Sequence, residues 1–182
     1  MRGFSLLEVL VAMAISSILL LGASRFLPAL QRGVLAQIQQ QTLEEEVWQR
    51  LFTLAKHLQR AGYCGGERCG DDALYIARQG QCVIIRWDGD SNGAWQTAPA
   101  DEADSIGFRL QTGVLETRRG ATACEGGGWD KMTDPATLTV TDFQVTRSAR
   151  VGLMPQLAIV LSARDTRGNR VSAQYSVTGY NL

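Results

Sequence analysis

Glu8 is a carboxylate inside an apolar run. Residues 4–23 contain no other charged residue and no proline. Twenty helical residues span about 30 Å, the thickness of the hydrocarbon core of a membrane. A carboxylate placed there costs about 2.5 kcal/mol or more, so its presence calls for a functional explanation. An ammonium group of a neighbouring chain would provide one, because buried opposite charges are tolerated as a pair better than singly.

Two simpler interpretations of the apolar run are less consistent with Glu8. A cleaved secretory signal has a basic start and a short apolar stretch, and an acidic residue near the start of that stretch argues against it. A plain membrane anchor has the right length but leaves the charge unexplained.

The segment Gly3-Phe4-Ser5-Leu6-Leu7-Glu8-Val9-Leu10 resembles the processing site of type IV prepilins and type II secretion pseudopilins. Every position of that motif matches, although the leader, residues 1–3, is short for the family. The resemblance implies cleavage between Gly3 and Phe4 by a prepilin peptidase, followed by N-methylation of Phe4. It also implies that Glu8 pairs with the amino terminus of a neighbouring subunit, either another minor pilin or the major pilin.

Four cysteines, Cys64, Cys69, Cys82 and Cys124, could form disulfides or bind a metal. No C-x-x-C motif occurs and His57 is the only histidine, which argues against zinc. If residues 73–78 and 82–88 form a hairpin, Cys82 lies at its turn and the first two cysteines lie near its open end, about 20 Å away. A disulfide needs Cα atoms within about 7 Å. We therefore expect Cys64–Cys69 and Cys82–Cys124.

The segment Asp88-Gly-Asp90-Ser-Asn92-Gly93 follows the first half of a calcium-binding loop. The twelfth position is Pro99, where such a loop has a bidentate acid. The same residue types also favour a tight turn between strands. Asp88, Asp90 and Asn92 are thus a weak calcium candidate, and we expect no other metal and no cofactor.

The sequence offers no recognisable catalytic constellation. It has no G-x-S-x-G motif, P-loop or paired catalytic carboxylates, and His57 has no nucleophile at a recognisable spacing. We therefore predict a protein that is not an enzyme, with His57 at the surface or the rim of the core. Trp95 and Trp129 lie beside glycine-rich loops, where local packing is the simpler role and ligand contact the alternative.

The 182 residues include 18 basic and 18 acidic side chains, so the chain has no net charge to attract nucleic acid. The basic residues are scattered, without the patch that a nucleic-acid surface needs. We expect no nucleic-acid partner.

One long helix should carry the functional residues. We expect a transmembrane and assembly helix over residues 4–30, which Pro28 should disturb, and an amphipathic continuation over residues 31–62. From Val47 the apolar residues recur at alternating steps of four and three, and Trp48 and Phe52 widen the apolar side. Gly62 is the expected terminator.

After residue 62 the pattern changes to short strands. We expect seven of them, and in residues 137–147 Leu138, Val140 and Asp142 should face one side and Thr139, Thr141 and Phe143 the other. Residues 63–182 should then form a β-rich head, which makes the fold α+β and pilin-like, with the helix packed on antiparallel sheet. The expected strands are residues 73–78, 82–88, 106–111, 114–119, 137–147, 156–164 and 171–178.

Residues 58–64 resemble the end of the long helix in large minor pilins and minor pseudopilins, and the cysteine spacing and residues 175–182 are similar to the same group. The resemblance implies a minor subunit that helps to start pilus assembly. Its alternatives are a minor pseudopilin of a type II secretion system and a tip adhesin or receptor. We expect a single-pass protein of the inner membrane with a cytoplasmic amino terminus and a periplasmic head, at the tip or base of the filament.

Overall fold

A computed structural model describes residues 5–97, 99 and 102–182. Its one long helix, α1 (Leu6–Arg60), has 55 residues and includes a stretch long and apolar enough to cross a membrane. The expected disturbance at Pro28 does not end the helix, because an isolated proline removes a single backbone N–H and the turns on both sides retain their own hydrogen bonds. Gly62 follows the helix with a φ of +83°, and its N–H donates to the carbonyl of Arg86 at 2.9 Å.

The chain divides into two compact units, residues 1–42 and 43–182. In the first unit every described side chain from Ser5 to Ile38 is exposed, including Leu6 at 79% and Leu20 at 71%. A helix that is apolar all round and has no protein against it needs lipid or other helices around it.

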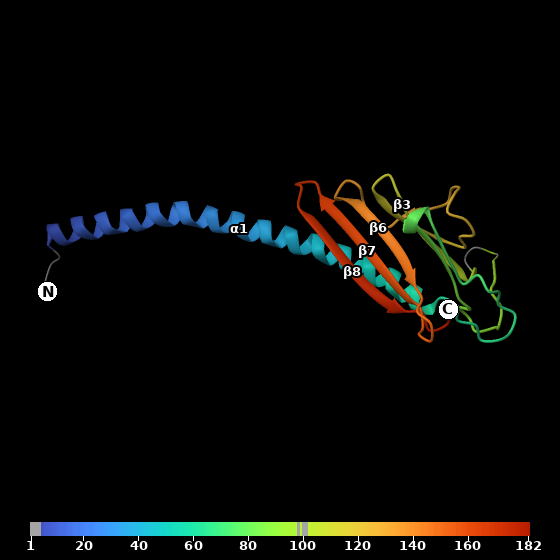
Figure 1. The fold of residues 1–182 in the computed structure, drawn as a ribbon. Helices are drawn as coiled ribbons and strands as arrows, with labels where there is room; N and C mark the ends of the chain where they lie inside the picture. Colours follow the sequence, from blue (N-terminus) through green and yellow to red (C-terminus); the bar gives the residue numbers. More distant parts are fainter. Residues whose placement is uncertain (1–4, 98, 100–101) are drawn as a thin grey trace. The chain divides into compact units, whose positions relative to one another are not determined.

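The second unit, which we call the head, contains two antiparallel sheets (Figure 1). The first follows the order β1-β2-β3-β4-β5, and the second, drawn in orange to red, follows the order β6-β7-β8. Seven strands match those expected from the sequence; the additional strand, β5, has two exposed residues and exists only through its pairing with Glu116 and Thr117 of β4. The strands are β1 (Leu74–Ala77), β2 (Cys82–Arg86), β3 (Ser105–Gln111), β4 (Val114–Arg119), β5 (Asp130–Lys131), β6 (Leu138–Ser148), β7 (Gln156–Asp165) and β8 (Arg170–Thr178).

The alternation expected in β6 is wrong beyond Val140. A β-bulge shifts the register between Val140 and Asp142, so two consecutive residues oppose one residue of β7. The shift moves Phe143 and Val145 to the face that already carries Leu138 and Val140, and all four side chains are buried. Asp142 thereby stays in solvent.

The core of the head forms between α1 and the two sheets. A stripe of α1 side chains, Leu43, Val47, Leu51, Leu54 and Leu58, is buried, with at most 4% of each exposed. They pack in one cluster with Phe108, Leu115, Phe143, Leu157, Ile159 and Leu161.

Trp48 and Phe52 differ from expectation, because 36% and 50% of these residues remain exposed. Their positions on α1 place them on the flank of the helix, where Phe52 meets Tyr175 of β8 edge-on with ring centroids 5.4 Å apart. The amphipathic stripe of the helix is therefore narrower than the sequence suggested.

Candidate functional site

The amino-terminal site begins outside the described residues, because Gly3 and Phe4 are not among them. The first residues that the structure describes form a capping box at the start of α1. The N–H of Ser5 donates to Oε2 of Glu8 at 3.2 Å, and the N–H of Leu7 donates to Oγ of Ser5 at 3.3 Å. Both bonds satisfy N–H groups that a helix start leaves without partners.

Glu8 accordingly has a neutral donor from its own chain and, among the described residues, no cation. Helical spacing places Ala12 and Ser16 on the same face as Glu8, one and two turns further on. Small residues on such a face allow another helix to approach closely in lipid. The role of Ser5 was missed from the sequence, although the S-x-x-E pattern was there to be read.

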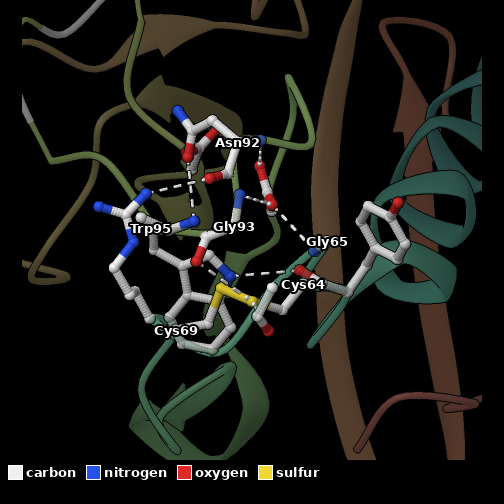
Figure 2. Close-up of a disulfide and its surroundings, with 12 residues drawn as sticks. Cys64, Gly65, Cys69, Asn92, Gly93 and Trp95 are labelled. Carbon is white, nitrogen blue, oxygen red and sulfur yellow. Dashed lines mark hydrogen bonds between the residues drawn. A yellow bond between two sulfur atoms is a disulfide. The ribbon is translucent and has the colours of Figure 1, made fainter.

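A second cluster of functional candidates lies in two loops that we call the loop pair, residues 63–69 and 88–95 (Figure 2). Asp88, only 1% exposed, joins them. Its Oδ2 accepts the N–H groups of Gly65 at 2.9 Å and Gly93 at 2.8 Å, and its Oδ1 accepts that of Asn92 at 3.1 Å. Desolvation acts to raise the pKa of Asp88, but the hydrogen bonds from Gly65 and Gly93 outweigh it and the net shift is downward.

The Cys64–Cys69 disulfide closes the first loop of the pair, and this is one of the two pairs expected from the sequence. Around it, the N–H of Arg68 donates to the carbonyl of Gly93 at 3.0 Å, and the indole N–H of Trp95 donates to the carbonyl of Tyr63 at 3.2 Å. Figure 2 shows Cys64, Cys69 and Trp95 side by side. The covalent bond and the hydrogen bonds together fix these two loops, in which only Asp88 and Gly93 are buried.

Three carboxylates, Asp88, Asp90 and Asp104, bring their oxygens within 4.8 Å of one another in the loop pair and the segment after it. Asp104 was not expected from the sequence, since it lies beyond the calcium-like motif. Each carboxylate already accepts N–H bonds; Asp104, for example, accepts those of Gly89 at 2.9 Å and Gln96 at 3.0 Å. Calcium usually takes six to eight oxygen ligands, whereas these carboxylate oxygens already accept N–H groups. The geometry therefore favours a structural role, in which the carboxylates hold the loops together. Calcium binding by Asp88, Asp90 and Asn92 stays an untested prediction.

The second disulfide, Cys82–Cys124, joins β2 to the glycine-rich loop of residues 124–129 and is buried. Arg109 lies beside it, with its guanidinium 4.3 Å from the ring centroid of Trp129 and its Nε 2.8 Å from a carboxylate oxygen of Glu116. Trp129 is thus occupied by a cation of its own chain. Together with the hydrogen-bonded Trp95, it lends no support to an aromatic ligand platform.

The amino-terminal features define the class of protein to which this chain belongs. Residues 1–24 match the prokaryotic N-terminal methylation motif. This segment contains the capping-box carboxylate near the start of the exposed apolar helix. The chain is thus a prepilin-like protein with an α+β head.

Residues 36–180 match the model of the family described as prepilin peptidase-dependent protein B. A curated protein of that name from Escherichia coli (strain K12) is 56% identical over 183 residues, covering 100% of this chain and 97% of the relative. The chain belongs to the prepilin peptidase-dependent protein B family. No solved structure matches it.

Proposed function

We propose that this chain is a non-enzymatic minor pilin-like subunit that helps to initiate assembly of a type IV pilus or pseudopilus. A prepilin peptidase would cleave it between Gly3 and Phe4 and the new amino terminus would be methylated. The observation that carries this proposal is the methylation motif joined to an exposed apolar helix that begins with a carboxylate. The name of the Escherichia coli relative supports dependence on the peptidase.

In the proposed assembly step, Glu8 exchanges partners. Before assembly its carboxylate accepts the N–H of Ser5, a neutral donor that only partly offsets the cost of a charge in lipid. In the filament it pairs with the amino terminus of a neighbouring subunit, which adds the missing positive charge. The pair specifies the register of the two helices, and the exposed apolar side chains of α1 exchange lipid for other helices. The partners are other minor pilins and the major pilin.

The proposed location follows from the same helix. The short basic leader stays in the cytoplasm, α1 crosses the inner membrane once, and the head enters the periplasm, where disulfides persist. Within a filament the subunit would lie at the tip or the base.

Processing is the direct test of the proposal. In cells that contain a prepilin peptidase, the intact mass of the purified chain should correspond to a chain that begins at methylated Phe4. Gly3→Ala should slow cleavage little or moderately, whereas Gly3→Arg should block it. An unprocessed wild-type chain in that background would contradict the proposal.

A minor pseudopilin of a type II secretion system is the second candidate, because the same methylation motif serves that machine. Processing would be identical, so the discriminating measurement is which activity fails when the chain is deleted. Loss of surface pili with normal protein secretion favours the pilus, and the opposite result favours the secretion system.

A further inference from the structure

Strand β8 forms an outer edge of the three-stranded sheet, and the backbone along this edge is unpaired (Figure 1). Its nine residues, Arg170–Thr178, pair with β7 in one continuous register. Among the described residues, no backbone group outside β7 forms a hydrogen bond with the backbone of β8. In an antiparallel strand every second residue directs its N–H and C=O groups to one side, so β8 presents a row of unpaired donors and acceptors over about 30 Å.

The other edges of the two sheets, as the structure describes them, are short or covered. β1 has four residues and β5 has two. Two turns lie against the outer edge of β6: the N–H of Val140 donates to the carbonyl of Gly113 at 2.8 Å, and the side-chain amide of Gln144 donates to the carbonyl of Gln79 at 3.1 Å. β8 has no proline and no bulge, two devices by which proteins protect such an edge. An unprotected edge of this length indicates a place where another strand is added.

A row of partly exposed aromatic side chains begins at this edge. Tyr175 of β8 contacts Phe52 of α1, and Phe52 contacts Trp48, with ring centroids 5.4 Å apart in both pairs. The core covers only part of each residue, because Trp48 is 36%, Tyr175 37% and Phe52 50% exposed. The side chains of an added strand would stand about 5 Å from those of β8, and the ones on the α1 side would cover this row. Aromatic residues of this kind are typical anchors of a protein interface.

The two faces of β8 specify which side chains the added strand should carry. Ala173 and Val177 are buried, and the two-residue period of a strand places Tyr175 on their face, the one toward α1. On the opposite face the hydroxyl groups of Ser162 and Ser172 share a hydrogen bond of 2.9 Å. A matching strand therefore alternates apolar residues, which face α1, with polar residues, which face solvent.

The charge at the start of β8 adds a further requirement. Arg170 lies directly opposite Arg164 of β7; both are exposed, and neither forms an ion pair among the described residues. Like charges that face each other across two strands destabilise a sheet. Residues 143–182 contain five arginines and a single acid, Asp165, whose carboxylate is already used in its own turn. A carboxylate on the added strand, opposite Arg170, would offset this repulsion.

We propose that β8 binds an extended segment of a different protein chain, which joins the sheet as an additional antiparallel strand. Every second residue of that segment is apolar and covers Phe52 and Tyr175, and an acidic residue lies opposite Arg170. Antiparallel addition continues the pattern of a sheet in which both existing pairings are antiparallel. The β8 strand of a second copy has no acidic residue and does not meet the charge requirement. This contact goes beyond the proposed function, because it involves the head and does not depend on Glu8.

A synthetic strand tests the proposal. The probe is the capped peptide Thr-Val-Thr-Val-Thr-Val-Thr-Val-Glu with a fluorescein-labelled Gly-Ser tail at its amino terminus, and its Glu falls opposite Arg170 in the antiparallel register. Fluorescence anisotropy measures its binding to the full chain in detergent, and hydrogen exchange locates the site. The peptide should slow exchange of alternate amides in residues 170–178 and leave residues 74–77 unchanged. N-methylation of every second peptide residue should abolish binding in one frame and preserve it in the other, because an added strand pairs through one of its edges.

Substitutions test the two side-chain requirements. Arg170→Glu should weaken binding about threefold or more, and a peptide with Lys in place of its Glu should restore it. Phe52→Ala and Tyr175→Ala should each weaken binding about tenfold. The matched control is Tyr75→Ala, which removes an exposed tyrosine from the edge strand β1 and should have no effect. All the substituted side chains are exposed, so the variants should fold, and disulfide mapping checks this.

Several results would overturn the proposal. They are equal effects of the two N-methylation frames, slowed exchange outside β8, equal losses in Tyr75→Ala and Tyr175→Ala, and no binding up to about 1 mM peptide. Slowed exchange in β8 that grows with the concentration of the chain alone would assign the edge to a second copy, and the same effect from phosphatidylglycerol vesicles alone would assign it to a membrane; either result would overturn it as well. Intact mass of the same samples reports processing separately, so failure of strand addition is distinguishable from failure of the proposed function.

Discussion

The two compact units of this chain encode their properties in different ways. In residues 5–38 every described side chain is exposed, and the functional features follow one another along the sequence within a few helical turns. In the head, the hydrophobic core and the contact between the two loops combine residues from distant parts of the chain; Asp88, for example, accepts the N–H groups of both Gly65 and Gly93. One unit is defined by a local motif and the other by tertiary packing.

This difference predicts which property a mutation in each unit should change. A change in the first unit should alter interactions with other chains. It should leave the stability of the head unchanged, because the described residues of the first unit form no hydrophobic core that the change could disrupt. A change in the head should alter the free energy of unfolding first and affect assembly through that loss. The following experiments test this separation.

Glu8→Val should have the largest effect. Membrane insertion should be intact or improved, since a charge leaves the apolar run. Breaking a buried charge pair costs about 3–5 kcal/mol, so assembly should fall by roughly two orders of magnitude or more. Counting filaments in cells without a wild-type copy measures this, and urea unfolding of the head should be unchanged. Normal piliation by Glu8→Val would refute the pairing role.

Glu8→Gln is the informative companion, because an amide oxygen can still accept the N–H of Ser5 while the charge is gone. If assembly also fails in the Glu8→Gln variant, the charge is what matters. If that variant supports assembly, the capping box accounts for the role of Glu8 and the first unit needs no partner charge.

Removing the two disulfides should destabilise the head by different amounts. The sequence separations are 42 for Cys82–Cys124 and 5 for Cys64–Cys69. On chain-entropy estimates these loops correspond to about 4 and about 2 kcal/mol of stability. Urea unfolding of the paired Cys→Ala variants, with the full chain in detergent, should show that order. Equal losses, or a filament defect without loss of stability, would contradict the separation of the two units.

The sequence predicted most of the fold because its periodicities are clear. The stripe from Leu43 to Leu58 has helical spacing and is the buried face of α1, and seven strands follow from alternating runs between glycine-rich turns. The failures have a common cause, which is tertiary context. The bulge after Val140 exchanges the faces of β6, and strand β5 exists only because β4 offers an edge to Asp130 and Lys131.

The candidate site divides in the same way. Gly3, Phe4 and Glu8 lie in one contiguous segment, residues 1–24, that matches the methylation motif, so the sequence alone was enough to propose them. Asp104 could not be predicted from a contiguous motif. It lies outside the calcium-like segment and approaches Asp88 and Asp90 only in the folded chain. The capping role of Ser5 could have been predicted, since S-x-x-E before an apolar run is a known signature of a helix start.

Gly62→Ala should have an intermediate effect. Gly62 has a φ of +83°, and a Cβ there would collide with the carbonyl oxygen of Asn181. The backbone conformation alone costs about 1–2 kcal/mol for a non-glycine residue, and the collision with the carboxy-terminal segment adds to it. The matched control is Gly33→Ala, where a Cβ meets nothing within 4 Å and the helix gains about 1 kcal/mol in propensity. Urea unfolding should report a loss of about 2 kcal/mol or more for Gly62→Ala and no loss in the head for Gly33→Ala.

The smallest effect should be a pH dependence that belongs to the head alone. His57 is half-buried between Trp87 and Phe108, with ring centroids 5.3 and 5.6 Å away, and its Nδ1 has no hydrogen-bond partner among the described residues. Desolvation first, and then the positive charges of Arg60 and Lys56, lower the pKa of His57 from 6.5 to about 4. Arg119 and the carboxylates of Asp90, Glu102 and Asp104 line the same cavity.

The sign of the pH effect follows from proton binding. Between pH 6.5 and about 4 the unfolded chain protonates His57 and the folded head does not, so stability falls as pH falls through this window and is flat above it. After allowance for solvent screening we expect about 1 kcal/mol, or about 2–4 °C in Tm, between pH 7 and pH 5. His57→Gln should remove this slope. The lowered pKa values of Asp88 and Asp165 affect stability only below about pH 4, so these two groups do not contribute to the slope between pH 7 and pH 5. A slope that survives His57→Gln would assign the effect to another group.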